Sequence, residues 1–319
     1  MGYALSAGYA ELYEEFLAWQ QRRVSARGYV SVQSTSRALL QWFEAQDIRL
    51  EEATVQDAFE YRAAAAGRVT KGGALVSAGT CCNLLKAARV FFRYLVMSGR
   101  RESNPFMAVG YPRMPERIHR NVLSEAQMGC LLERLRRFTN VAQYKAHVIA
   151  ELLYATGLRI AEAASLAPSD IDTRQRLVYI REGKGGKART AFLTGYAAEA
   201  LERYLRRGRE LVLRSYCGPR PQGHTVFCVG FARLSQELNP ALREACTALE
   251  LPVITSHGFR HSLGTHLLRA GCDMRHIQAI LGHDQLRTTQ VYTHLDKDDV
   301  KASLDAHHPR QWNRKEVEG

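Results

Sequence analysis

The sequence predicts a mainly α-helical protein with a small β-sheet, arranged as two domains. Apolar residues recur at helical spacing through most of its 319 residues, and 46% of the chain is hydrophobic. Two short segments of strand character flank one glycine-rich turn. A stretch dense in proline and arginine separates two mainly helical regions, so we expect each region to bury its own core.

The first domain, residues 1–107, is expected to be helical throughout. Thr54 is suited to cap a helix that ends at Gly67, and the glycines of residues 69–79 predict a loop. The expected helices cover residues 9–22, 34–46, 55–67 and 80–98.

Residues 108–122 are expected to link the domains. Pro105, Gly110, Pro112 and Pro115 fall within a short stretch that also holds three arginines, which excludes a continuous helix. An ordinary surface loop is the alternative. The change of composition on both sides favours a basic interdomain linker.

The second domain, residues 123–319, opens with a capping box formed by Ser124 and Gln127. Gly157 is suited to end a helix as a left-handed C-cap. A β-hairpin with a basic, glycine-rich tip is expected from residues 177–182 and 188–193. The expected helices of this domain cover residues 142–156, 196–214, 234–249, 258–270, 273–281 and 288–293.

The charge of the chain favours a polyanionic partner. Lys and Arg number 44 against 32 Asp and Glu, a net charge of +12, and most of the excess follows residue 108. Nucleic acid fits such a surface, although an anionic membrane also does. No run of apolar residues is long enough to span a membrane, and no secretory signal is expected. Seven cysteines without a Cys-x-x-Cys pair predict reduced thiols in a cytoplasmic protein.

Motifs for nucleotide and metal chemistry are absent from the sequence. It contains no P-loop, no His-Glu-x-x-His and no clear acidic cluster typical of a two-metal nuclease. We therefore expect neither a cofactor nor a metal. A protein of this kind that attacks phosphodiesters must neutralise the phosphate with its own cations.

Two segments place cations where a phosphate can reach them. Arg159 follows a helix end, where its guanidinium can bind two phosphate oxygens, and Glu162 can hold that guanidinium in place. A surface salt bridge is the alternative. Lys184 lies at the hairpin tip, where it can enter a DNA groove and protonate a departing sugar oxygen. A solvated basic turn is the alternative there.

Three further segments supply imidazoles, a second guanidinium and a phenol. His257 and Arg260 share a helical face near a helix N-terminus, which favours anions, although a buried structural His beside a surface Arg is the alternative. His283 follows the helix end at Gly282 and can reach another element. Tyr292 lies on a short helix, although a lone tyrosine is far more often a packing residue.

Zinc is a weaker interpretation of the clustered histidines. His257, His261, His266 and His283 lie close together in the sequence. The spacings are not those of common zinc sites, and no cysteine pair accompanies them. Ordinary helix-surface histidines are favoured.

Taken together and in this order, these segments resemble the tyrosine recombinase (phage integrase) family, and within it the Xer-like branch. The resemblance covers nearly the whole chain and is densest over residues 121–310. The family signature of Arg, Lys, His-x-x-Arg, His or Trp, and Tyr is complete. It is carried by the stretches TGLRIAEAASL, EGKGGKARTAFL, SHGFRHSLGTHLLRAG, IQAILGHDQLRTTQVYTHLD and AHHPR.

The resemblance implies a role for each member of the signature. Arg159 and Arg260 bind the scissile phosphate, and Lys184 is the general acid for the 5′-hydroxyl leaving group. His257 assists proton transfer from the nucleophile, and His283 donates a hydrogen bond to a non-bridging oxygen.

Tyr292 is the nucleophile that the resemblance implies, and it forms a 3′-phosphotyrosine. Free tyrosine ionises near pH ~10, so fixed positive groups are needed to favour the phenolate and to stabilise charge on the phosphate. The covalent bond stores the energy of the broken linkage, so resealing needs no ATP. This agrees with the missing nucleotide and metal motifs.

The resemblance also implies an architecture and partners. The two domains would form a C-shaped clamp on double-stranded DNA, closed by the linker. The protein would act on paired recombination sites at the nucleoid as a homo-tetramer, or as a hetero-tetramer with a related recombinase, and without a membrane partner. Residues 297–310 are expected to dock on a neighbouring protomer, and folding back in cis is the alternative.

The sequence leaves three functions open, of which a site-specific recombinase is favoured. A type IB topoisomerase shares the chemistry but lets one strand swivel, and the compact clamp and Xer-like ending argue against it. A DNA-binding protein that has lost catalysis is the third, and the complete residue set argues against it.

Overall fold

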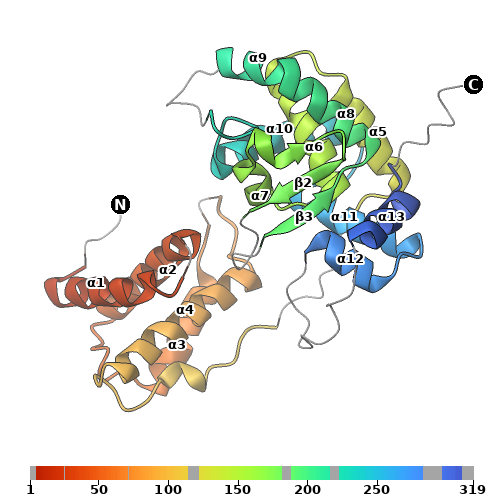
Figure 1. Cartoon of the computed structure of the whole chain (residues 1–319). Coiled ribbons are helices and arrows are strands. Elements are labelled where there is room, and N and C mark those ends of the chain that lie inside the picture. The colour runs from red at the N-terminus through yellow and green to blue at the C-terminus, as the bar shows by residue number, and fades with distance from the viewer. Residues whose placement is uncertain are drawn as a thin grey trace, which may run out of the picture. The chain divides into compact units, whose positions relative to one another are not determined.

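The computed structural model describes residues 5–24, 26–70, 72–113, 122–181, 188–215, 223–282 and 297–310. The chain divides into two compact units, Met1–Ile118 and His119–Gly319, each with its own hydrophobic core (Figure 1). Helix makes up 66% of the structure, and the described sheet has three strands. The predicted fold class is therefore confirmed. No described helix is both long and apolar enough to cross a membrane.

The first unit is a helical bundle around an aromatic core. Phe16, Phe43, Phe91 and Phe92 are each at most 1% exposed and meet between the helices. Burial of such rings is the main source of stability for a bundle of this size. The described elements are α1 (Ala7–Gln21), α2 (Ala26–Ala45), α3 (Val55–Gly67), α4 (Ala78–Met97) and the 3-10 turn η1 (Pro105–Met107).

Local capping chemistry sets the start of α3 where the sequence predicts it. The Thr54 hydroxyl accepts the Asp57 N–H at 3.2 Å, and the Asp57 carboxylate accepts the Thr54 N–H at 2.7 Å. By contrast, α2 begins well before the expected residue 34. Residues 28–35 are all at least partly exposed, and only Tyr29 and Val32 pack partly against the core, so that part of the helix has a weak apolar pattern.

The second unit is built around α6, whose residues from Lys145 to Thr156 are all buried. Helices α5, α8, α10 and α11 pack on it. The described helices are α5 (Glu125–Arg136), α6 (Val141–Thr156), α7 (Ile160–Ser165), α8 (Gly195–Arg203), α9 (Arg209–Arg214), α10 (Phe231–Ala248), α11 (Ser256–Arg269), α12 (Met274–Leu281) and α13 (Lys297–His307), with the 3-10 turn η2 (Pro168–Asp170) and the π-helical turn η4 (Tyr204–Gly208).

The predicted hairpin is present as β2 (Leu177–Ile180) and β3 (Arg189–Phe192), which pair antiparallel with Ile180 opposite Arg189. The strand β1 (Ile171–Asp172) adds to the other edge of β2. Both hairpin strands are shorter than expected. A strand of two residues such as β1 has too few positions to show a period in the sequence.

The predicted helix at 196–214 is interrupted by the π-helical turn η4. Gly208 closes this turn, and a Cβ at that position would lie 2.3 Å from Cε1 of Tyr144. The glycine lets the tyrosine ring pack directly against the backbone. This contact depends on the tertiary fold and has no local signal.

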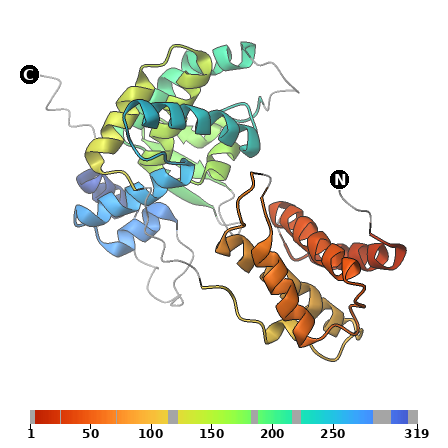
Figure 2. The same ribbon diagram turned by 180° about the vertical axis from the view of Figure 1, so that it is seen from behind.

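Helices α11, α12 and α13 gather at one end of the second unit (Figures 1 and 2, blue). Val300 and Leu304 of α13 are buried in this unit's core, and Asp305 forms an ion pair with Arg176 at 2.8 Å. The resemblance implies that this segment docks on a neighbouring protomer. In the single chain it docks on its own unit, the alternative of folding back in cis.

Candidate active site

The turn between α6 and α7 forms the base of the candidate site. Gly157 follows α6 with a φ of +62°, the left-handed C-cap that the sequence predicts. A Cβ there would lie 2.5 Å from Cδ2 of Leu281, so the turn needs glycine for its conformation and for space. Arg159 then occupies the N-cap position of α7, a helix of six residues that the sequence pattern does not reveal.

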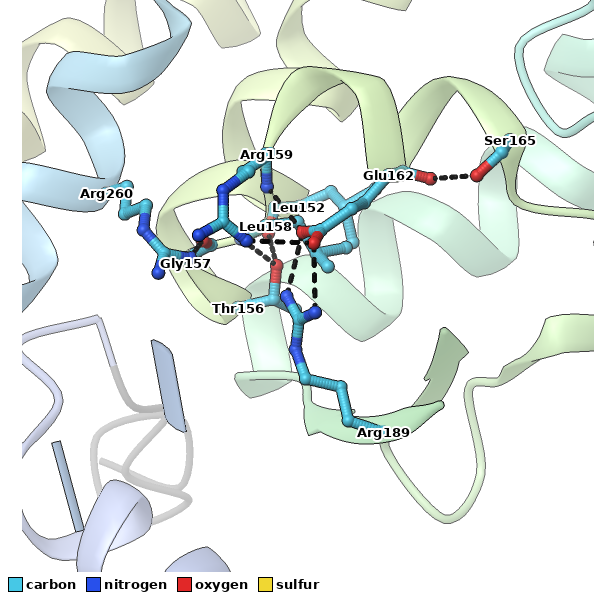
Figure 3. A network of polar contacts seen from close by, with 9 residues as sticks. All are labelled: Leu152, Thr156, Gly157, Leu158, Arg159, Glu162, Ser165, Arg189 and Arg260. Atoms are coloured by element: carbon cyan, nitrogen blue, oxygen red, sulfur yellow. Dashed lines mark hydrogen bonds and ion pairs between the residues drawn. The ribbon is translucent and has the colours of Figure 1, made fainter. Parts of the chain in front are cut away.

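Glu162, in the first turn of α7, gathers two arginine side chains (Figure 3). Its carboxylate accepts the Arg159 backbone N–H at 2.8 Å and the Arg159 Nη1 at 3.1 Å. Arg189, at the start of β3, donates to the same carboxylate through Nη1 and Nη2 at 2.9 and 2.8 Å. Burial would raise the pKa of Glu162, but hydrogen bonds from Arg189 and Arg159 hold it below its ordinary value. The ionised carboxylate therefore fixes both guanidiniums.

Arg260 brings a third guanidinium to the same turn from α11. Its Nη1 donates to the carbonyl of Gly157 at 2.6 Å, and the residue is only 4% exposed. Among the described residues, its buried Nη2 has no hydrogen-bond partner. Burial, followed by the charge of Arg159, lowers the pKa of Arg260 to about 10, so it stays cationic at neutral pH. A buried guanidinium with an unpartnered N–H is suited to bind an anion.

His257 lies in the first turn of α11, one turn before Arg260. It is exposed, and its ring centroid lies 4.4 Å from that of His261. The alternative of a buried His beside a surface Arg is wrong, because the two exposures are the reverse. Desolvation, followed by the charges of His261 and Arg260, lowers the pKa of His257 below its ordinary value. The imidazole is therefore neutral at physiological pH and can accept a proton.

Comparisons with known proteins assign this arrangement to a family. The model of the phage integrase family matches residues 121–299. Tyrosine recombinase XerC of Bacillus pumilus is 35% identical over 240 residues, which cover 74% of this chain and 76% of that protein. The chain belongs to the phage integrase family. It is a tyrosine recombinase, an enzyme that breaks and rejoins DNA.

Further relatives of this recombinase extend the match to most of the chain. Tyrosine recombinase XerD of Vibrio vulnificus is 29% identical over 313 residues, 95% of this chain and 96% of that protein. The Tn1549 transposon integrase in complex with transposon right end DNA gives a TM-score of 0.65 at 18% identity, over 92% of this chain and 98% of that one. A lambda integrase dimer bound to a COC′ core site gives 0.62 at 16% identity, over 96% and 97%. These structures confirm the fold, and the comparisons give no support to the type IB topoisomerase alternative.

Three predicted site residues of the recombinase lie outside the described residues. They are Lys184, His283 and Tyr292, and the expected helix at 288–293 lies there too. The described strands β2 and β3 lead into and out of the segment that holds Lys184. Helix α12 ends with Gly282 in the left-handed region directly before His283. The roles of these three residues, like those of Arg159, His257 and Arg260, stay predictions.

Arg189 is not among the site residues that the sequence predicts. A signal was present, because this arginine stands in a short, otherwise mostly apolar strand immediately after the basic turn. An arginine at a half-buried strand position needs an acidic partner nearby. The pattern could not name that partner, since Glu162 lies 27 residues earlier in the chain.

One histidine of the zinc interpretation has a different use in this recombinase. His266 is fully buried, with Nδ1 2.8 Å from the Tyr154 hydroxyl and Nε2 2.8 Å from the Leu123 carbonyl. Both ring nitrogens are therefore engaged. In the part of the chain that the structure describes, no three His, Cys, Asp or Glu side chains are grouped to hold a metal.

Proposed function

We propose that this recombinase exchanges strands between paired DNA sites through a 3′-phosphotyrosine formed by Tyr292. The observation that carries the proposal is the meeting of Arg159 and Arg260 at the Gly157 turn. Glu162 compensates only part of the positive charge gathered there, because Arg189 shares it. Neighbouring guanidiniums repel each other unless an anion neutralises them, and a phosphodiester carries the required charge.

The proposed reaction balances its protons without a cofactor. The phenol oxygen of Tyr292 attacks the phosphorus, and the bond to the 5′-oxygen breaks. His257 accepts the phenol proton, and Lys184 gives a proton to the departing oxygen. Arg159, Arg260 and His283 stabilise the negative charge on the phosphate. Each arginine contact is worth about 3 kcal/mol in the transition state. The reverse steps reseal the strand.

We propose DNA as the partner from the charge of the chain and from the structurally similar integrases. The chain carries a net charge of +12, and the Tn1549 and lambda integrase structures contain DNA. We assign residues 1–107 to DNA binding, 108–122 to a basic linker and 123–319 to catalysis, the two domains clamping the duplex. Affinity is expected to fall steeply with salt, because counterions are released from each contacted phosphate.

Exchange between two duplexes requires four strand cuts, and each chain supplies one Tyr292. We therefore propose a tetramer on DNA, built from this chain alone or together with a related recombinase. Its substrate makes the bacterial nucleoid its place of action.

The test is covalent trapping of DNA in cells that express the protein, followed by sequencing of the attached DNA. Wild-type protein is expected to yield adducts at a recurring site. Tyr292→Phe is expected to bind DNA but yield none, because only the phenol oxygen can attack. Tyr179→Phe is the matched control, since this tyrosine lies 45% exposed on β2 and is expected to behave as wild type. Adducts that persist in Tyr292→Phe would remove the nucleophile assignment, and their absence from wild type would remove the whole proposal.

A further inference from the structure

Arg189 holds Glu162 through a fork of two hydrogen bonds. Its Nη1 donates to Oε1 at 2.9 Å and its Nη2 to Oε2 at 2.8 Å (Figure 3). The Glu162 side chain is 5% exposed and that of Arg189 is 16% exposed, so solvent screens the pair only weakly. This bidentate geometry is the strongest that an arginine and a carboxylate form.

Arg159 holds the same carboxylate by a single side-chain bond, from Nη1 to Oε1 at 3.1 Å. The Arg159 side chain is 30% exposed, more than either Glu162 or Arg189. Because Arg189 occupies both oxygens, Arg159 is limited to one of them. If Arg189 were removed, Arg159 would be the one arginine partner left to Glu162 among the described residues. Its guanidinium would then bind both carboxylate oxygens.

Arg189 also lies against the chain that leads to His283. A Cβ on Gly282 would meet Nε, Cδ and Cζ of Arg189 at 2.6, 2.8 and 2.9 Å. Gly282 has a φ of +63°, so its conformation and its lack of a side chain both suit this close approach. The Nε of Arg189 is buried, and it has no hydrogen-bond partner in the described residues. The guanidinium is thus fixed between α7 and the end of α12.

We propose that Arg189 is a positioning residue for strand cleavage: it occupies Glu162 so that most of the Arg159 guanidinium stays available for the scissile phosphate. The inference rests on the proposed function, in which Arg159 binds that phosphate. A purely structural role, in which the Arg189 pair only fastens β3 to α7, makes a different prediction. In that case the charge of Glu162 affects cleavage only by holding β3 against α7, and its removal cannot restore the rate.

The test measures covalent adduct formation in a single turnover, on a nicked duplex that carries the site recovered from wild-type adducts. DNA affinity and melting temperature are measured in parallel. Arg189→Gln is expected to slow cleavage about 100-fold with little change in DNA affinity, since the phosphate-binding group is displaced. Arg181→Gln is the matched control. It removes the same charge from the residue that directly follows β2, where the arginine pairs with Asp170 and is 69% exposed.

The double variant Glu162→Gln, Arg189→Gln separates the two roles. A neutral amide no longer attracts Arg159, so the double variant is expected to cleave at least about tenfold faster than Arg189→Gln. If Arg189→Gln does not fold, the same comparison uses Arg189→Lys with and without Glu162→Gln. Cleavage by Arg189→Gln at the wild-type rate, or a folded double variant no faster than the single one, overturns the inference. Absence of adducts from wild type overturns the proposed function instead.

Discussion

Arg310 fastens the end of the described chain to its own unit. Its Nε and Nη2 donate to the Glu151 carboxylate at 2.6 to 3.2 Å, and Nη2 also reaches Glu133 at 2.9 Å. The guanidinium carbon lies 4.4 Å from the centre of the Tyr196 ring. Glu151 is 2% exposed, whereas the Glu133 side chain is 48% exposed. Arg310→Ala therefore leaves a buried carboxylate without its counter-charge.

The expected loss follows from that burial. A buried ion pair that loses one partner costs about 3–5 kcal/mol of unfolding free energy, whereas the exposed Glu133 contact adds at most about 1 kcal/mol. Burial raises the pKa of Glu151, and the loss of Arg310 raises it further. When a carboxyl has a higher pKa in the folded than in the unfolded state, the protein loses stability as the pH rises between the two values. The deficit of the variant is therefore larger at pH ~8 than at pH ~5.

The assay is urea and thermal unfolding followed by circular dichroism at both pH values, with the transition of the second unit compared between proteins. At pH ~8, Arg310→Ala is expected to melt roughly 10 °C lower. Glu133→Gln is the control and is expected to stay within about 1 kcal/mol of wild type. Adding Glu151→Gln to Arg310→Ala should recover part of the loss, because no buried charge remains. An Arg310→Ala protein as stable as wild type at pH ~8, or with the same deficit at pH ~5, refutes the reasoning.

Three other outcomes are expected. Lys184→Ala should slow cleavage more than it weakens DNA binding, and a substrate with a better 5′ leaving group should restore the rate; no restoration counts against an acid role. Because the pKa of His257 is lowered, the wild-type cleavage rate should climb with pH below the ordinary histidine value of 6.5, and the climb should be absent in His257→Gln. Burial lowers the pKa of His308 to about 4, so its contribution to stability, present above pH 6.5, should be lost as the pH falls toward 4. This loss of up to ~3 kcal/mol in the free energy of unfolding should not occur in His308→Gln, and urea unfolding at several pH values measures it.

Features with a local cause could be predicted from the sequence. The capping box of Ser124 and Gln127 is present, with the Gln127 N–H donating to the Ser124 hydroxyl at 3.2 Å. Gly157 ends α6 as predicted, because the left-handed conformation strongly favours glycine. In both cases the few residues that make the signal also make the structure.

Features set by distant partners could not be predicted. The helical period places His257 and Arg260 on one face, but it does not say which of them faces the interior. Arg260 is the buried one because it reaches the carbonyl of Gly157, 103 residues earlier. The same limit applies to Arg310, which finds Glu151 from 159 residues away. Such contacts exist only once the core around α6 has formed.

The charge balance at the turn between α6 and α7 ties these observations to the proposed chemistry. Arg159 and Arg189 share one carboxylate, Glu162, and Arg260 adds a third guanidinium that pairs only with the carbonyl of Gly157 among the described residues. A fold selected for stability alone gains nothing from a buried cation whose Nη2 lacks a partner among the described residues, because desolvation of a charge is costly. An anion that enters the site removes this cost. A phosphate supplies both the negative charge and the oxygens that the unpartnered N–H groups need. In the proposed reaction, the phosphate of the bound DNA strand completes the site, which is why the fold can tolerate it incomplete in the free protein.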